Sequence, residues 1–155
     1  PGVCFFDTEG CVAPDLRPTL IDRGTLVGLL TTKKSAEKLN LPNTGTAAAS
    51  YDGVPTLGFN RFYAEPTAPT LSALVPGKAI YIVMTSGGDI TPGGHFASPV
   101  QMSYLMENGR LVGRLPELNI GGDFSDFLGN DYIGAVRGDP SPDSMLCAVV
   151  MDVNM

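Results

Sequence analysis

Histidine is nearly absent from this sequence of 155 residues, and tryptophan is absent altogether. The single histidine is His95, so the chain contains neither an HExxH nor an HExxxH motif. A catalytic zinc ion typically takes about three protein ligands, and histidine is usually among them. The chain therefore cannot build a standard zinc-protease site from its own residues.

Charged side chains are also scarce. They make up 17% of the sequence, against 43% hydrophobic residues, and the net charge is −6. Binding to nucleic acid or to an anionic membrane surface depends on Lys and Arg, and no apolar run approaches the ~20 residues that span a bilayer. We therefore expect no nucleic acid and no membrane among the partners. The shortage of solvating charge indicates that a partner or another domain covers part of the surface, and it also suits a compact β domain.

Cysteine is limited to Cys4, Cys11 and Cys147. Their odd number and wide spacing do not form a disulfide framework. Reduced thiols are typical of the cytoplasm, so we expect a cytoplasmic protein. Cys147 lies in the apolar run MLCAVVM, where a cysteine usually packs as a small hydrophobic residue. The chain begins at Pro1 and enters the apolar run 3–6 at once, which indicates a piece of a longer polypeptide.

One short phrase occurs twice in the chain. Residues 20–30 read LIDRGTLVGLL, and residues 105–115 read LMENGRLVGRL. The second copy has an Asn-Gly dipeptide at 108–109, and the first has Arg-Gly at 23–24. Asn-Gly between apolar runs is a strong signal for a type I′ turn, which needs a positive φ at both central residues. The repeat therefore predicts two similar β-hairpins.

The rest of the pattern predicts an α+β fold, in which residues 1–155 form a single, mostly antiparallel β domain with two or three short helices. The apolar, β-branched run at 79–84 predicts a buried strand. Residues 43–60 and 86–99 are rich in small residues and predict two long loops. The other expected elements are a strand at 3–6, a turn at 7–10, a helix at 33–39 capped by Thr31 or Thr32, an extended stretch at 62–65, a helical turn at 71–74 capped by Thr70, an extended stretch at 118–120, a turn capped by Asp123, and strands at 132–136 and 145–153 that close the sheet.

The histidine invites a catalytic interpretation and also has a simpler one. His95 lies in the glycine-rich phrase PGGHF, where a solvated loop histidine is the simpler interpretation and a general base is the alternative. A Ser-His-Asp site would combine His95 with Ser86 or Ser98 and with Asp89. No GxSxG elbow supports such a site.

Acidic pairs and glycine pairs are the other candidates. Asp7 with Glu9, and Asp123 with Asp126 near Asp131, could serve in acid–base chemistry. Turns and helix caps explain these acids more simply. None of the glycine pairs is followed by the Gly-Lys-Ser/Thr of a phosphate cradle, so we interpret them as positions of unusual backbone angles in turns.

A set of phrases spreads along nearly the whole chain. Its members are FDTEG at 6–10, the first hairpin phrase at 20–30 with SAEKL at 35–39, NTG at 43–45, YLMENGR at 104–110 and IGGDF at 120–124. This set resembles the C-terminal domain of the TldD/PmbA family, whose members were once named modulators of DNA gyrase.

The resemblance implies a zinc metalloprotease of two subunits. One subunit, TldD, carries HExxxH upstream of this domain, and a cysteine near its C-terminus completes the metal site. The other subunit, PmbA or TldE, lacks the metal motif and is a non-catalytic partner. The pair is associated with trimming peptide precursors and with degrading small unfolded proteins. The resemblance thus implies no cofactor in this chain, with zinc in the partner or in the full complex.

Two departures from the family pattern favour the non-catalytic subunit. TldD-like chains carry a C-G-K-x-G-Q phrase around the metal cysteine, whereas Cys147 is followed by Ala-Val-Val-Met, as in PmbA. Residues 94–97 read GHFA where the family has G-D-F-S, so His95 lies where no family ligand is expected. The implied partners are a TldD-like catalytic subunit and extended or unfolded peptides, and assembly into a homo-oligomer is also open.

Two alternatives stay open beside the PmbA-type interpretation. The chain is the C-terminal part of the catalytic subunit if Cys147 is a ligand to a zinc ion held by upstream residues. From a different class, it is a stand-alone protein-interaction module. Under the PmbA-type interpretation, we expect residues 43–60 and 86–99 to contact the partner or to wall a chamber.

Overall fold

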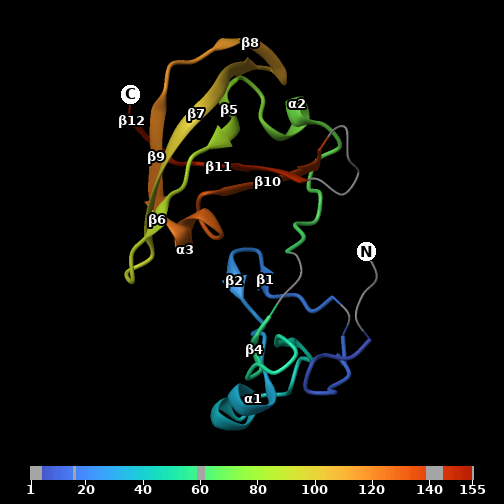
Figure 1. The fold of residues 1–155 in the computed structure, drawn as a ribbon. Coiled ribbons are helices and arrows are strands. Elements are labelled where there is room, and N and C mark those ends of the chain that lie inside the picture. Colours follow the sequence, from blue (N-terminus) through green and yellow to red (C-terminus); the bar gives the residue numbers. More distant parts are fainter. Residues whose placement is uncertain (1–4, 16, 59–61, 139–144, 155) are drawn as a thin grey trace. The chain divides into compact units, whose positions relative to one another are not determined.

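The structure is a computed structural model that describes residues 5–15, 17–58, 62–138 and 145–154. The chain forms two compact units, Pro1–Phe62 and Tyr63–Met155, drawn together in Figure 1. Its elements are short helices and mostly antiparallel strands, so the predicted α+β class is confirmed. In the described part of the chain, no helix has the length and apolar character needed to cross a membrane.

Unit 1 is built from two small hairpins and one helix. Strand β1 (Ile21–Asp22) pairs with β2 (Thr25–Leu26), and β3 (Ala47–Ala48) pairs with β4 (Thr56–Leu57). The prediction of one long loop at 43–60 is therefore wrong in part, because two short alanine- and threonine-containing segments pair within it. The first two residues of the strand predicted at 3–6 lie outside the described residues, and its last residue, Phe6, forms an isolated bridge with Val12.

Helix α1 (Lys33–Leu39) has the predicted bounds. Thr32 is the N-cap, and its hydroxyl and that of Ser35 form a reciprocal capping box. Asn40 ends the helix in the left-handed conformation with a φ of 51°. Few side chains of unit 1 are buried among the described residues, and they are small: Thr31, Thr32, Ala36 and Ala47.

Unit 2 is organised around one long strand, β7 (His95–Glu107). The first half of β7 pairs with β6 (Asp89–Ile90) and β9 (Leu118–Asp123), and the second half pairs with β5 (Lys78–Thr85) and β8 (Arg110–Arg114). Strand β12 (Asp152–Asn154) pairs with β9. Figure 1 shows β7 running through this sheet.

The prediction of a second long loop at 86–99 is wrong. Strand β6 and the start of β7 occupy much of that segment. The glycines at 93–94 belong to a tight turn between these strands, closed by a hydrogen bond from the Gly94 N–H to the Thr91 carbonyl at 2.9 Å. A glycine-rich composition therefore indicated a turn here, but it did not indicate the paired strands on either side.

The prediction that the strands at 132–136 and 145–153 close the main sheet is wrong in part. Strand β11 (Met145–Val149) pairs with β10 (Tyr132–Arg137) in a separate two-stranded ribbon, visible in Figure 1, and β12 alone joins the large sheet. The apolar core of the sheet consists of Val100, Leu118 and Ile120, with Ile80, Ile82, Leu115 and Met151 packed against them.

Two single-turn helices complete unit 2. Helix α2 (Leu71–Leu74) has the predicted cap, because the Thr70 hydroxyl accepts a hydrogen bond from the Ala73 N–H. Helix α3 (Phe124–Phe127) begins after Asp123, but the Asp123 side chain makes no capping hydrogen bond. Asp123 therefore occupies the predicted N-cap position, without the side-chain hydrogen bond that usually accompanies it.

Both copies of the repeated phrase form the predicted hairpins. The φ angles are 47° and 77° at the first turn, Arg23 and Gly24, and 48° and 79° at the second, Asn108 and Gly109. Positive φ at both central residues is the type I′ geometry. The sequence signal for these turns is thus confirmed in both units.

Candidate functional site

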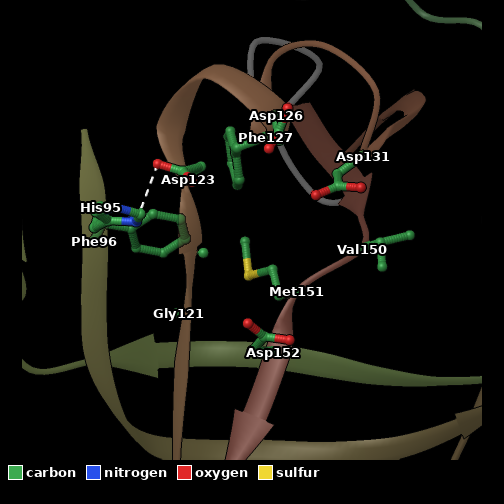
Figure 2. A pocket seen from close by; sticks show the side chains of 11 residues that line it. His95, Phe96, Gly121, Asp123, Asp126, Phe127, Asp131, Val150, Met151 and Asp152 are labelled. Atoms are coloured by element: carbon green, nitrogen blue, oxygen red, sulfur yellow. Dashed lines mark ion pairs between the residues drawn. The ribbon is translucent and has the colours of Figure 1, made fainter. Parts of the chain in front are cut away.

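Unit 2 contains a polar pocket of about 300 Å³ at one end of β7 and β9. Four aspartates and the single histidine line it together with apolar side chains (Figure 2). The polar lining residues are His95, Asp123, Asp126, Asp131 and Asp152, and the apolar ones include Phe96, Phe127, Val150 and Met151. We call this site the acidic pocket.

Strand pairing places the histidine of the acidic pocket beside a carboxylate. His95 is the first residue of β7 and lies opposite Asp123 on β9. The His95 Nδ1 and Asp123 Oδ1 atoms are 3.1 Å apart, as the dashed line in Figure 2 marks. A carboxylate at Nδ1 orients the imidazole ring and leaves Nε2 available for a proton or a ligand. Both side chains are accessible, with 71% of His95 and 35% of Asp123 exposed.

Aromatic rings form the apolar wall of this pocket. Phe96 meets Phe127 edge to face, with ring centres 5.9 Å apart, and Phe127 stacks on Phe124 at the same distance. Offset stacking and edge-to-face contacts are the favoured aromatic geometries. Phe124 and Phe127 therefore lie on one face of the turn.

The Ser-His-Asp combination that the sequence left unsupported does not form with Ser98 and Asp89. The carboxylate beside His95 belongs to Asp123, and Asp89 lies on β6 opposite Ala97. Ser98 is three residues along β7 from His95, so its side chain projects from the other face of the strand. There it is buried, and its hydroxyl donates a hydrogen bond to the Gly87 carbonyl at 2.8 Å.

Cys147 lies on β11, opposite Ala135 of β10, as an exposed free thiol. Partial desolvation by its neighbours raises the pKa of Cys147, and a hydrogen bond from the Tyr132 hydroxyl opposes that rise. Partial burial raises the pKa of Tyr132, and the charge and hydrogen bonding of the Cys147 sulfur raise it further. A thiol with a raised pKa is a poor metal ligand and a poor nucleophile, because both roles require the thiolate.

The donor atoms around Cys147 do not fit a zinc site. A structural or catalytic zinc ion needs three or four donors at once. Among the described residues, the acids, histidine and cysteines come within reach of one common ion only at Asp7, Glu9 and Cys11 in unit 1. Neither Cys147 nor the acidic pocket belongs to such a group.

The cluster in unit 1 is engaged in hydrogen bonds within the protein. Asp7 Oδ1 accepts the N–H groups of Glu9 and Cys11 at 3.0 and 2.8 Å, and its Oδ2 accepts the Ala47 N–H at 3.0 Å. Burial acts to raise the pKa of Asp7, but these backbone donors and the charge of Lys33 outweigh it and hold the pKa below its ordinary value. The prediction that Asp7 organises a turn agrees with this geometry.

Glu9 and Asn43 extend this cluster to the other phrases of unit 1. Glu9 Oε2 accepts the N–H of Lys33, the first residue of α1, at 2.8 Å. The Asn43 amide donates to the Cys11 sulfur at 3.4 Å, and its Oδ1 accepts the Gly45 N–H at 2.7 Å. These hydrogen bonds join the FDTEG phrase to helix α1 and to the NTG phrase. Because the side-chain oxygens already accept backbone N–H groups, the cluster has a structural role rather than that of a metal site.

Comparison with known proteins gives this arrangement a context. The family described as the PmbA/TldA metallopeptidase C-terminal domain matches residues 1–146. The matched segment ends at Leu146, so it does not include Cys147. A protein named metalloprotease from Methanothermobacter thermautotrophicus is 24% identical over 138 residues, which cover 86% of this chain and 30% of that protein.

Three solved structures share the fold over 97% of this chain. Two are proposed modulators of DNA gyrase. The one from Thermotoga maritima has a TM-score of 0.63, 22% identity and 34% of its length covered. The one from Bacteroides thetaiotaomicron has a TM-score of 0.67, 22% identity and 32% covered. The third, TldE from Thermococcus kodakarensis, has a TM-score of 0.71, 17% identity and 34% covered. The chain thus spans about a third of the length of these relatives.

Proposed function

Because the chain belongs to the PmbA/TldA metallopeptidase family by its C-terminal domain, we propose that residues 1–155 form the C-terminal domain of a non-catalytic subunit of the PmbA/TldE type. The family's activity depends on a metal, and under this proposal the metal is zinc, held by a TldD-like catalytic subunit. The assembled complex acts on extended or unfolded peptides in the cytoplasm.

The observation that supports this proposal is that residues 1–155 offer few metal ligands. Within residues 1–155, the one histidine is engaged with Asp123, and Cys147 is followed by Ala-Val-Val-Met rather than by the phrase of TldD-like chains. Cys147 has a raised pKa and lies outside any three-donor group among the described residues. A domain with these residues contributes surface and shape to a protease rather than metal ligands.

A domain without catalytic groups can still shape a peptide-processing chamber. The β3–β4 hairpin within residues 43–60 and the β6–β7 turn within residues 86–99 are our candidates for contacts with the catalytic subunit. Polar backbone groups at sheet edges can also pair with extended chains. Both segments contain exposed apolar side chains, such as Tyr51, Val54 and Ile90.

One observation favours a second candidate, the C-terminal part of the catalytic subunit itself. Cys147 is free and exposed, so a zinc ion bound by other parts of a longer chain could reach it. Binding of zinc would displace the thiol proton and override the raised pKa. The relative from Methanothermobacter thermautotrophicus carries the name metalloprotease.

Metal content and activity separate the two candidates. The full-length protein would be purified alone and with a TldD-like subunit, and zinc per chain and cleavage of an unfolded peptide would be measured. We expect neither zinc nor cleavage for the protein alone, and full activity of the complex with Cys147→Ser. Cys11→Ser is the control for replacing a thiol elsewhere. One zinc per chain in the protein alone, lost in Cys147→Ser, would instead establish the catalytic alternative.

A further inference from the structure

Unit 2 contains a second pocket, of about 290 Å³, whose character is opposite to that of the acidic pocket. Its lining is mostly apolar, and its one charged residue is an arginine. The residues that define it are Leu71, Tyr81, Leu111, Val136, Arg137 and Leu146. We call it the Arg137 pocket.

The walls of the Arg137 pocket are held in place by the second hairpin turn. The Asn108 N–H donates to the Gly77 carbonyl at 2.7 Å, and the Gly77 N–H donates to Asn108 Oδ1 at 3.0 Å. Gly109 also lines the pocket, and a Cβ atom at this position would approach the Ser72 backbone nitrogen to 2.9 Å. The turn therefore packs closely against α2 and fixes one wall of the pocket.

The lining predicts what would fit. Val136 is 2% exposed and provides a rigid apolar surface, whereas Leu111 is 53% exposed and leaves an apolar side chain open to solvent. A volume near the lower end of the ~300–1,000 Å³ range of ligand sites suits a small group rather than an extended ligand. One large aliphatic or aromatic side chain is a ligand of suitable size and polarity.

The charge at the pocket specifies the other half of the ligand. Arg137 ends β10, and its side chain is exposed. The ion pairs among the described residues involve Arg23, Lys78 and His95, and none engages Arg137. A guanidinium group binds a carboxylate through two parallel hydrogen bonds. On a chain of net charge −6, an arginine that lies beside an apolar cleft, and that has no ion pair within the described residues, favours an anion that carries an apolar group.

We propose that the Arg137 pocket binds the C-terminal residue of a peptide, with an apolar side chain in the cleft and the α-carboxylate on Arg137. The choice of a peptide rests on the proposed function in peptide processing. The pocket then selects peptides by their last residue and by a free C-terminus.

Calorimetric titration of the full-length protein, without a catalytic subunit, tests this assignment. The probes are N-acetyl-Ala-Ala-Leu with a free carboxylate, the same peptide as its C-terminal amide, and N-acetyl-Ala-Ala-Gly with a free carboxylate. We expect the first probe to bind about tenfold more tightly than either of the others, since each comparison removes one half of the recognition. Equal binding of the acid and the amide, or no binding of the acid, would overturn the proposal.

Two variants locate the site. Arg137→Gln should weaken binding of the free acid about tenfold while leaving the amide unchanged. Arg114→Gln is the matched control, because Arg114 is an exposed arginine on β8 that does not line the pocket. Loss of binding in Arg114→Gln but not in Arg137→Gln would place the ligand elsewhere. Thermal unfolding of both variants reports whether each is folded.

A fourth probe, octanoate, distinguishes a peptide terminus from a free fatty acid. Binding as tight as that of the leucine peptide would show that the pocket recognises any amphipathic carboxylate, and would overturn the peptide assignment. These titrations need neither zinc nor cleavage, so their failure would leave the proposed subunit role standing. Failure of that role in the metal measurement would likewise leave the binding result intact.

Discussion

The two hairpins built from the repeated phrase have nearly identical turns and very different surroundings. Among the described residues of unit 1, β1 and β2 have two residues each and pair only with one another, and Ile21, which corresponds to Met106 of the second copy, is 38% exposed. In unit 2, the corresponding hairpin begins with the 13-residue strand β7, which pairs with four other strands, and Met106 is 2% exposed. The phrase determines the turn, but neighbouring strands decide how far a hairpin extends, since an isolated two-stranded hairpin is marginal in water.

The same contrast separates the two units as a whole. Unit 2 has a buried apolar core of Val100, Leu118 and Ile120. In unit 1, the side chains that connect distant segments are polar, with Asp7 holding three backbone N–H groups and Thr31 accepting and donating hydrogen bonds toward residues 42–44. Unit 2 is therefore held mainly by apolar packing, and unit 1 by directional hydrogen bonds. Each of the following variants tests that difference.

The largest effect is expected in the core of unit 2. Leu118 is 3% exposed, and Leu118→Ala should lower the free energy of unfolding by about 2–5 kcal/mol through lost packing and a cavity. Leu26→Ala, at the exposed hairpin of unit 1, should change it by less than about 0.5 kcal/mol. Urea unfolding followed by circular dichroism measures both. Similar effects of the two substitutions would abolish the contrast between the units.

The turn glycines compare the two hairpins directly. Gly109→Ala should lower the free energy of unfolding by about 2–4 kcal/mol. The reason is that a side chain at this position combines a positive φ of 79° with a clash against the Ser72 backbone. Gly24 has a similar φ of 77° but is exposed. Gly24→Ala should therefore lower the free energy of unfolding only through the strain of a positive φ, by about 1–2 kcal/mol. Hydrogen exchange of amides near each turn would show an equal loss of protection if tertiary packing did not matter.

The polar network of unit 1 is tested at its centre. Asp7→Ala leaves the N–H groups of Glu9, Cys11 and Ala47 without their acceptor, and should destabilise unit 1 by about 1–3 kcal/mol. Asp52→Ala is the control, because Asp52 is exposed and has no side-chain hydrogen bond among the described residues. Hydrogen exchange around α1 and β3 should respond to the first variant and not to the second.

The charge on Asp7 makes unit 1 sensitive to acid. Its pKa is lowered in the folded state, so the stability that it contributes is present above its unfolded pKa and is lost as the pH falls through the folded value. Amide exchange in unit 1 should accelerate below about pH 4 relative to the intrinsic rate. Asp7→Asn should reduce this dependence. An unchanged pH profile in that variant would assign the effect to other carboxylates.

The smallest effect is expected at the rim of the acidic pocket. His95 and Asp123 form an exposed pair, and His95→Asn should change the free energy of unfolding by less than about 1 kcal/mol. Where His95 is protonated, the effect should shrink further in high salt because the ion pair is screened. Thermal unfolding at two salt concentrations checks this. A loss comparable with that of Leu118→Ala would show that the pair supports the sheet.

Local signals in the sequence predicted local features well. Thr32 and Asn40 bound α1 because capping needs only neighbouring residues, and the two turn dipeptides had the expected backbone angles. The sequence did not predict the strands on either side of the 93–94 glycines. These segments are extended because β6 pairs with β7 and the start of β7 pairs with β9. The composition of residues 86–99 contains no sign of those partners.

In the candidate sites, the sequence alone determined which residues are present, and the tertiary structure determined which of them meet. By itself, the sequence determined that the chain has one histidine, no HExxxH motif, a recurring hairpin phrase and the phrases of a metallopeptidase-family domain, because these are properties of residue identity and order. Only the tertiary structure decided that His95 meets Asp123 rather than Asp89, and that Glu9 reaches the first turn of α1. These contacts join residues 28 and 24 positions apart, and strand register and loop closure, which no local pattern encodes, bring them together.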